Sequence, residues 1–312
     1  MTEKQKDMAV PGKSVRAEIR HFQMPDTLGG KLRVWRFLIA RRFIQVSILV
    51  LFMGTLHYGW TLFNQLVLTG NMSSSRLFGV IPLSDPFAVL QVIASLQWPH
   101  MDALIGAAIV LAVYLLLGGR VFCAWACPVN MVADLANWLR EKWGIRSMFI
   151  VPSKTRYWAL LLTLILSFIL GVAAFEWVSP IAIMHRELIY GIGLGFIAVL
   201  GIFIFDLLVM ARGWCGHFCP LGAFWSVVGR TAQIRVAFDD ASCTRCGDCV
   251  KECPEPSVLS FKEAAQHGMV RSGECTNCGK CIVVCPENSL SFNLRACIRS
   301  NSALRSEHGS TS

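Results

Sequence analysis

The chain has 312 residues, of which 54% are hydrophobic and only 16% are charged. Soluble domains carry about 25% charged residues, so this composition argues against an ordinary soluble protein and favours a membrane protein. A net charge of +9 could suit a nucleic-acid-binding protein. The basic residues, however, lie in segments that flank apolar runs, as expected beside a membrane. We therefore expect no nucleic-acid partner.

Residues 1–42 are polar and basic and include Pro11, Pro25 and the pair Gly29-Gly30. They predict a loosely ordered tail. The first apolar run begins at Phe43 and is longer than the core of about 7–15 residues in a cleavable secretory signal. We therefore expect it to be a retained membrane anchor.

Four apolar runs reach the roughly 17–25 residues that a transmembrane helix needs. They cover residues 43 to about 66, 103–119, 157–175 and 188 to about 211. The shorter segment between Pro86 and Trp98 predicts a helix that lies in the interface or dips back into the membrane. Residues 129–143 have apolar side chains at helical spacing and predict a helix along the membrane surface. The expected membrane domain, residues 43–230, is therefore all-α with four transmembrane helices.

The Lys and Arg residues of the loops predict the orientation. Ten precede Phe43, six lie between the second and third runs, and eleven follow from Arg212 onwards, while the two remaining loops hold only Arg76 and Arg186. Cytoplasmic loops carry the excess of positive charge. We therefore expect a multi-pass protein with both termini in the cytoplasm.

Two copies of one motif follow the second and fourth apolar runs. Each has an Arg, then an aromatic residue two positions on, then Cys-x3-Cys-Pro, and we name these segments the elbows. The elbow cysteines are Cys123 and Cys127 in the first copy and Cys215 and Cys219 in the second. Two thiols four residues apart lie on one face of a helix, which the proline then ends. The repeat predicts two hairpins related by an axis along the membrane normal.

The four elbow sulfurs could ligate a metal or a cluster, cycle between dithiol and disulfide, or serve only as buried small side chains. Because Arg120 and Arg212 are in register and should lower the thiol pKa values, we favour a redox or metal role. His217, in the slot that Trp125 occupies in the first copy, is either a ligand or an ordinary interfacial histidine.

Asp206 lies inside the cytoplasmic end of the fourth run, where an ionisable residue suggests function. It either accepts a quinol proton or pairs with Arg212. His57, Glu176 and His185 lie towards the other face and could line a second quinol pocket, or are interface residues. Together with the four elbow cysteines, Asp206 is our candidate for a catalytic role.

Residues 231–296 are polar and rich in cysteine, and predict a small α+β domain of the ferredoxin type. They contain two runs of Cys-x2-Cys-x2-Cys-x3-Cys-Pro, the spacing of bacterial ferredoxins with two 4Fe–4S clusters, in which the fourth cysteine of each run ligates the other cluster. The residues after each Cys-Pro, 258–261 and 290–292, predict short paired strands. The expected ligands are Cys243, Cys246, Cys249 and Cys285 for the first cluster and Cys275, Cys278, Cys281 and Cys253 for the second.

A pair of zinc knuckles is the alternative, since structural zinc sites also use four ligands. Two complete runs, each ending in Cys-Pro, fit two cubane clusters better. The thirteenth cysteine, Cys297, lies outside both patterns, in a C-terminal tail of residues 297–312.

Four apolar runs, two elbows and a terminal two-cluster ferredoxin segment closely resemble the NapH family. These proteins are membrane quinol dehydrogenase components of periplasmic nitrate reductase systems. Relatives in nitrous oxide reductase activation, cytochrome oxidase copper maturation and methylamine utilisation share the elbows. The first typically adds a large outer flavin-bearing domain and the second a C-terminal sandwich domain. We expect neither in this chain, so the methylamine relative stays open.

The resemblance implies an electron-transfer subunit in the bacterial inner membrane. The orientation predicted from the Lys and Arg residues places its ferredoxin domain in the cytoplasm. It would oxidise menaquinol or ubiquinol from the quinone pool. Electrons would pass to NapG, a periplasmic iron–sulfur protein, and on to nitrate reductase. The competing function is a maturation factor, in which the ferredoxin domain reduces a metal or a disulfide of another enzyme and the elbow thiols handle the metal.

Overall fold

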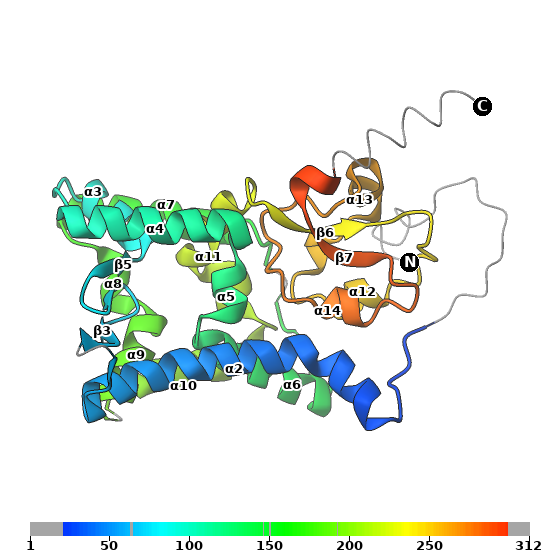
Figure 1. The fold of residues 1–312 in the computed structure, drawn as a ribbon, viewed down its shortest axis with the longest axis horizontal. Helices are drawn as coiled ribbons and strands as arrows, with labels where there is room; N and C mark the ends of the chain where they lie inside the picture. The colour runs from blue at the N-terminus through cyan, green and yellow to red at the C-terminus, as the bar shows by residue number, and fades with distance from the viewer. Residues whose placement is uncertain (1–20, 63–64, 146, 150, 192, 299–312) are drawn as a thin grey trace.

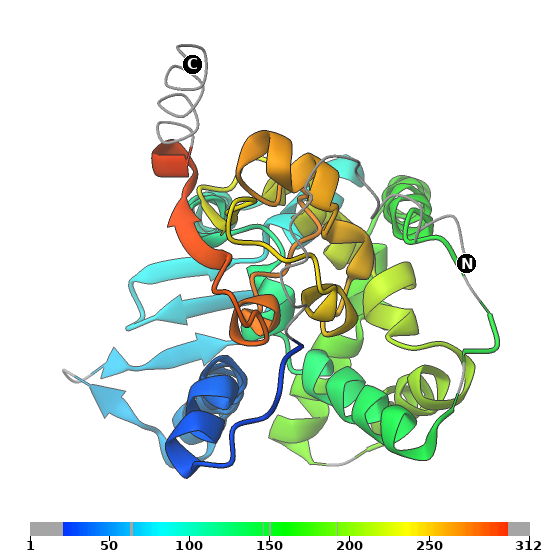
Figure 2. The same cartoon turned by 90° about the vertical axis from the view of Figure 1, so that its right-hand side faces the viewer.

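The structure is a computed structural model that describes residues 21–62, 65–145, 147–149, 151–191 and 193–298. Figure 1 shows two parts end to end, a longer helical part and a smaller ferredoxin-type part. The long helix α2, Leu28–Tyr58, runs beneath both. Figure 2 views the molecule from the ferredoxin end, with the cyan strands standing to one side of the helices.

Helix α2 corrects two expectations. Thr27 caps its N-terminus by accepting from the Gly30 amide, and Gly59 ends it in the left-handed conformation. Residues 28–42 are thus helical rather than a loosely ordered tail, and the first apolar helix ends at Tyr58 rather than near residue 66. The helix can begin early because its basic first half finds partners elsewhere in the fold, described below.

Strands, which an all-α domain would lack, follow α2. β1, Thr61–Leu62, pairs antiparallel with β2, Gln65–Leu66. β3, Leu68–Gly70, β4, Ser74–Leu77, and β5, Ile81–Ser84, form an antiparallel sheet in that order. The expectation of an all-α domain is therefore wrong for residues 61–84.

The short helix predicted after Pro86 is present as α3, Pro86–Ala94. Asp85 caps it by accepting from the Phe87 amide at 3.1 Å. Phe87 and Gln91 are fully buried, because α3 packs against both α4, Met101–Leu117, and α7, Thr155–Leu170.

By length and composition, α2 with its 31 residues is the single helix in the described part of the chain that could cross a membrane. α4 and α7 are apolar but have 17 and 16 residues. α10, Gly195–Ile204, continues into the π-helix η1, Phe205–Val209, as a third shorter apolar helix. Four transmembrane helices therefore stay a prediction.

The elbow motifs follow α4 and η1. The first elbow contains α5, Val121–Trp125, and leads into α6, Val129–Trp143, which has the bounds expected for the amphipathic helix. The second contains the π-helix η2, Trp214–Phe218, and leads into α11, Pro220–Gly229. Between the two copies lie α7, α8, Ala174–Val178, and α9, Pro180–Tyr190.

The ferredoxin-type part is built on β6, Ile234–Phe238, paired antiparallel with β7, Leu290–Leu294. The strand expected at 290–292 is present, but the one expected at 258–261 is not. There the 3₁₀-helix η3, Pro256–Val258, is followed by α13, Phe261–His267. The short helices α12, Asp248–Lys251, and α14, Lys280–Val283, pack against each other.

Candidate functional site

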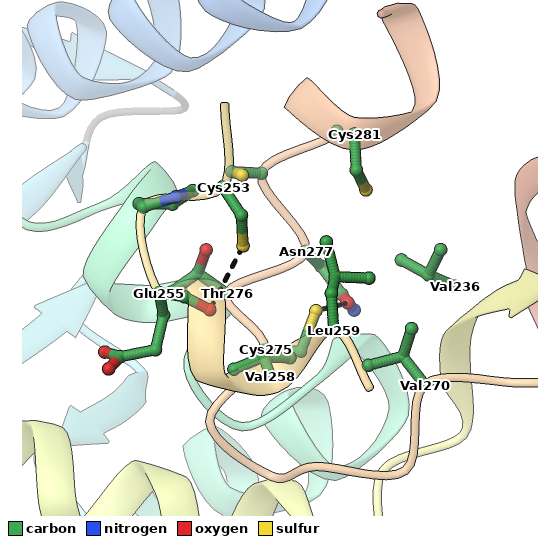
Figure 3. A pocket seen from close by; sticks show the side chains of 13 residues that line it. Val236, Cys253, Glu255, Val258, Leu259, Val270, Cys275, Thr276, Asn277 and Cys281 are labelled. Carbon is green, nitrogen blue, oxygen red and sulfur yellow. Dashed lines mark hydrogen bonds between the residues drawn. The ribbon is translucent and has the colours of Figure 1, made fainter. Parts of the chain in front are cut away.

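The eight ferredoxin cysteines surround two separate cavities. One is lined by Cys253, Cys275, Cys278 and Cys281, three of which are labelled in Figure 3. The other is lined by Cys243, Cys246, Cys249 and Cys285. These two sets coincide with the crossed ligand sets expected from the sequence. Four thiolates are the donor set of a 4Fe–4S cluster, so each cavity could hold one.

Tight loops place these cysteines. Gly247 and Gly279 adopt left-handed φ values of 84° and 75° at the starts of α12 and α14. The Arg245 amide donates to the Cys243 sulfur at 3.4 Å, and the Ser289 amide donates to that of Cys285 at 3.3 Å. Hydrogen bonds to cluster sulfurs tune reduction potentials. Within the described ranges, no three His, Cys, Asp or Glu side chains are grouped to hold a single metal ion.

Helix α2 closes over one of these loops. A Cβ atom on Gly279 would lie 2.4 Å from the Phe37 ring, so only glycine allows this approach. The same ring meets that of Phe292 edge-on, with centroids 5.6 Å apart. At the neighbouring helix α12, the Phe22 amide donates to Asp248 at 2.9 Å. The N-terminal segment therefore binds the ferredoxin part through both apolar and polar contacts.

The four elbow cysteines are brought together. Cys215 interacts electrostatically with the other three, and Cys127 with Cys123 and Cys219. Burial raises the pKa of all four thiols, that of Cys219 to about 12. Arg120 acts in the expected direction on the pKa values of Cys123 and Cys219, but these values stay raised. Arg120 does lie beside Cys123, but its charge does not outweigh burial.

The second elbow is held by buried polar contacts of η1. Asp206 is fully buried, and its Oδ1 accepts from the Trp214 amide at 3.0 Å. Arg140 donates to the carbonyl oxygens of Asp206 and Leu207 at 3.1 and 2.8 Å. The expected pairing partner Arg212 instead binds the Asp134 carboxylate at 2.6 Å. Asp206 thus positions the second elbow. π-Helices such as η1 and η2 are frequent at functional sites.

The first elbow is held from two sides. Gln45 of α2 is fully buried and donates to the carbonyl oxygens of Ala124 and Cys127, each at 3.1 Å. On the other side, Trp125 donates from Nε1 to the Asn277 carbonyl at 3.1 Å. Asn277 lies between Cys275 and Cys278. The first elbow therefore directly contacts the loop that lines the cavity of Cys253, Cys275, Cys278 and Cys281.

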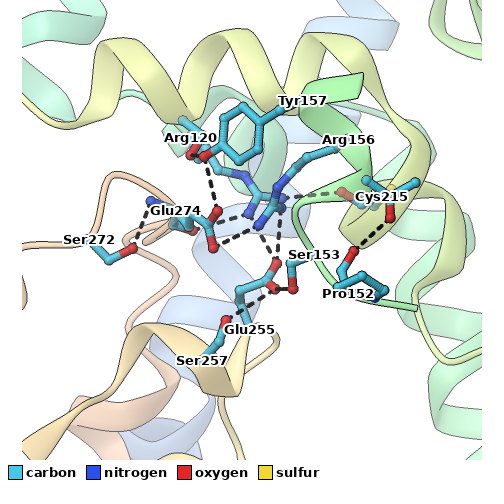
Figure 4. Close-up of polar contacts among 12 residues, drawn as sticks. Arg120, Pro152, Ser153, Arg156, Tyr157, Cys215, Glu255, Ser257, Ser272 and Glu274 are labelled. Carbon is cyan, nitrogen blue, oxygen red and sulfur yellow. Dashed lines mark hydrogen bonds and ion pairs between the residues drawn. The ribbon is translucent and has the colours of Figure 1, made fainter. Parts of the chain in front are cut away.

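A buried cluster of charges joins the two parts at the same place (Figure 4). The Glu255 carboxylate accepts from Arg120 at 3.1 Å and from Arg156 at 3.2 Å. Arg156 also lies 2.8 Å from Glu274. Arg120 donates to the carbonyl of Cys215 at 3.2 Å and so touches the second elbow. Both arginines belong to the helical part, and both glutamates belong to the ferredoxin-type part.

Sequence reasoning missed most of these supporting residues. Glu255 follows Cys253-Pro254 and Glu274 precedes Cys275. Their position as charged neighbours of the cysteine runs was the sequence signal that could have identified them as supporting residues. Asp134, which binds Arg41, Arg42 and Arg212, had no local signal. At the second elbow, His217 has a buried Nδ1 without a partner in the described part of the chain.

Two family models match the chain. A 4Fe–4S binding domain matches residues 99–146 and 192–236, and a 4Fe–4S dicluster domain matches residues 235–286. The first match contains the four elbow cysteines, and the second contains the eight ferredoxin cysteines. The chain is therefore an iron–sulfur protein of the ferredoxin type. No solved structure matches it.

Several curated proteins are similar over most of the chain. The methylamine utilization ferredoxin-type protein MauN of Methylorubrum extorquens is 44% identical over 74% of this chain and 79% of its own length. The ferredoxin-type protein NapH of Escherichia coli is 43% identical over 74% and 79%, and that of Haemophilus influenzae is 43% identical over 72% and 77%. The chain belongs to the NapH family of ferredoxin-type proteins, and it is about as similar to MauN as to NapH.

Proposed function

We propose that this chain is a membrane electron-transfer subunit that oxidises menaquinol or ubiquinol and passes the electrons on through iron–sulfur centres. The observation that carries the proposal is the contact between the first elbow and the cysteine loop at Asn277. The 3.1 Å hydrogen bond from Trp125 and the buried charge cluster join two groups of cysteines into one unit. Such a unit suits electron transfer between the helical part and the ferredoxin part.

The proposed ligands are the two crossed sets of four ferredoxin cysteines. When bound, a 4Fe–4S cluster accepts and releases one electron at a potential set by hydrogen bonds and exposure. The chain contributes the thiolates, the amide donors at Arg245 and Ser289, and the cover that Phe37 places over Gly279. Phe37 covers the loop of one site, and the two amide donors belong to the other.

We propose that the four elbow cysteines form one further redox or metal site. Their burial and their mutual electrostatic interactions support it, as does the match of a 4Fe–4S binding domain to the two elbow segments. Single Cys→Ser changes at Cys123, Cys127, Cys215 or Cys219 should then be about equally damaging to quinol oxidation per assembled protein. A double change across both elbows should be no worse than a single one, because residues that act as a unit are not additive. Near-normal rates in all four single variants would contradict a shared site.

The proposed subunit spans the inner membrane four times with both termini in the cytoplasm. Besides α2, the helices α4, α7 and α10 expose large apolar side chains such as Leu116, Phe168 and Ile197, as lipid contact requires. A helix of 17 residues is about 26 Å long, close to the ~30 Å hydrocarbon core. A periplasm-active reporter fused after Arg76 or Arg186 should be active, and one fused after Lys142 should be silent. An active reporter at the C-terminus would overturn this orientation.

The decisive experiment is an anaerobic titration of the purified holoprotein with decylubiquinol or menadiol. Bleaching of the cluster absorbance in proportion to added quinol would support quinol oxidation. If dithionite reduces the clusters and neither quinol does, the proposal is wrong.

The electron acceptor would be a NapG-type periplasmic iron–sulfur protein that leads to nitrate reductase. The similarity to MauN favours a second assignment, in methylamine utilisation. A maturation role, with elbow thiols handling metal, is the competing class. Deleting the gene separates the three roles. Loss of nitrate-dependent anaerobic growth would support the nitrate reductase role, and loss of growth on methylamine would support the methylamine role. A lower metal content of a purified client enzyme would support the maturation role.

A further inference from the structure

A cavity of about 550 Å³ lies at the end of the helical part that is farthest from the ferredoxin part (Figure 1). Its wall comes from the end of α2, from β3 and the loop after it, and from α8 and α9. Ligand pockets have volumes of about 300–1,000 Å³ and combine apolar walls with a few placed polar groups. The size therefore suits a small organic molecule.

Two acid–base side chains line this cavity. Glu176 accepts a hydrogen bond from the Ser73 hydroxyl at 2.6 Å, which fixes its carboxylate. His185 is 3% exposed, and its Nε2 has no partner in the part of the chain that the structure describes. The Phe52 ring meets the imidazole edge-on at 4.6 Å and holds its plane. Buried polar atoms nearly always have a partner, so the orphaned Nε2 points to a ligand or a water.

The rest of the wall combines apolar and polar groups. Leu56, Met72 and Ile183 line the cavity, and Trp177 is 78% exposed beside it. Arg186 is the one basic residue of the wall. An aromatic ring could lie against these side chains, and a hydrocarbon tail could leave along the exposed apolar surface. His57, which the sequence suggested as a third member, is not part of the wall.

We infer that this cavity binds the head group of a quinol, with Glu176 and His185 as its two hydrogen-bonding partners. This inference rests on the proposed function and adds the place where the substrate binds. A carboxylate can only accept hydrogen bonds, and a neutral imidazole nitrogen can accept one. The pair therefore suits the two hydroxyl donors of a quinol better than the two carbonyl acceptors of a quinone.

The test uses the holoprotein in lipid nanodiscs and a photoreactive azido-ubiquinol with a short tail. We expect labelled peptides from residues 176–186, and loss of that label in the presence of excess decylubiquinol but not of dodecanol. Glu176→Gln and His185→Gln should each weaken decylubiquinol binding about tenfold, since a lost charge-assisted or buried hydrogen bond has that effect. Asp102→Asn is the matched control, because Asp102 is exposed and pairs with Arg76 outside the cavity.

The outcomes separate the two proposals. Labelling elsewhere, or wild-type affinity in both variants, would overturn the cavity assignment. If the variants lose binding but quinol never reduces the wild-type clusters, the cavity assignment holds and the proposed function fails. If quinol reduces the clusters of both variants at the wild-type rate, the function holds and the cavity assignment fails. Ser73→Ala, which frees the Glu176 carboxylate without removing it, provides a milder variant if either substitution prevents folding.

Discussion

The buried charge cluster between the two parts should make them unfold as one unit. Glu255→Gln keeps the shape of the side chain but removes the charge that faces Arg120 and Arg156. Arg120 is 3% exposed and Arg156 is 0% exposed, so water cannot replace the lost partner. Arg156 would retain Glu274, at 2.8 Å, while Arg120 would retain two backbone carbonyls and the Cys123 side chain.

Removing one partner of a buried ion pair costs about 3–5 kcal/mol. We therefore expect Glu255→Gln to lose about that much free energy of unfolding, and Arg156→Met to lose a similar amount because it removes the charged partner that Glu255 and Glu274 share. The double variant should cost less than the sum of the two by about 1–3 kcal/mol, since residues in one network are coupled. The exposed pair Arg76–Asp102 is the control, and breaking it should cost no more than about 1 kcal/mol.

The assay is denaturant unfolding of the detergent-solubilised holoprotein, followed in parallel by tryptophan fluorescence and by cluster absorbance. In the wild type the two signals should change together, because the buried charge cluster couples the helical part to the ferredoxin part. In the variants, cluster absorbance should be lost at lower denaturant than fluorescence. Additive energies in the cycle, or a loss near 1 kcal/mol for Glu255→Gln with iron content unchanged, would refute the reasoning.

Three further predictions concern the supports of the site. Burial raises the pKa of Asp134, but Arg212, Arg41 and Arg42 outweigh it and hold that pKa below its usual value. The stability advantage over Asp134→Asn should therefore be constant above about pH 5, decline as the pH falls below about 4, and be lost only below the lowered pKa of the folded state, as pH-dependent unfolding would show. Trp125→Phe leaves the Asn277 carbonyl without its donor and should cost about 1–3 kcal/mol, against about 0.5 kcal/mol or less for the exposed Trp158→Phe in the same melts. Cys253→Ser should remove the cluster bound by Cys275, Cys278 and Cys281 and spare the other; if electron paramagnetic resonance instead assigns the loss to the Cys243 run, the crossed assignment is wrong.

Elements with a strong local pattern could be predicted from the sequence. Helix α6 has the expected bounds because Pro128 precedes its first residue, Gly144 ends it in the left-handed conformation, and its apolar residues keep one helical face. The grouping of the ferredoxin cysteines followed from their spacing. In both cases neighbouring residues determine the geometry.

The missed elements depend on distant partners or on a competing local signal. Arg41 and Arg42 resemble a tail in sequence, yet they lie in α2 because Asp134, more than ninety positions away, neutralises them. Residues 258–261 do not form a strand because Ser260 caps α13 by accepting from the Glu263 amide at 3.5 Å. The true partner of β7 could have been found, since Ile234, Val236 and Phe238 alternate with a strand's period of two.

Elbow cysteines from both copies lie in the apolar core of the helical part. Cys127 and Cys219 belong to one apolar core with Phe87, Phe175 and Trp225. Ring contacts in that core run from Phe175, the neighbour of Glu176, through Phe87 and Phe224 to Trp225 and Phe122, with centroids 5.2–6.2 Å apart. Phe122 adjoins Cys123, and Trp125 reaches the ferredoxin loop. A redox site at the elbows would therefore lie between the proposed quinol cavity and the clusters, and loss of elbow function should interrupt electron transfer without affecting quinol binding or iron content.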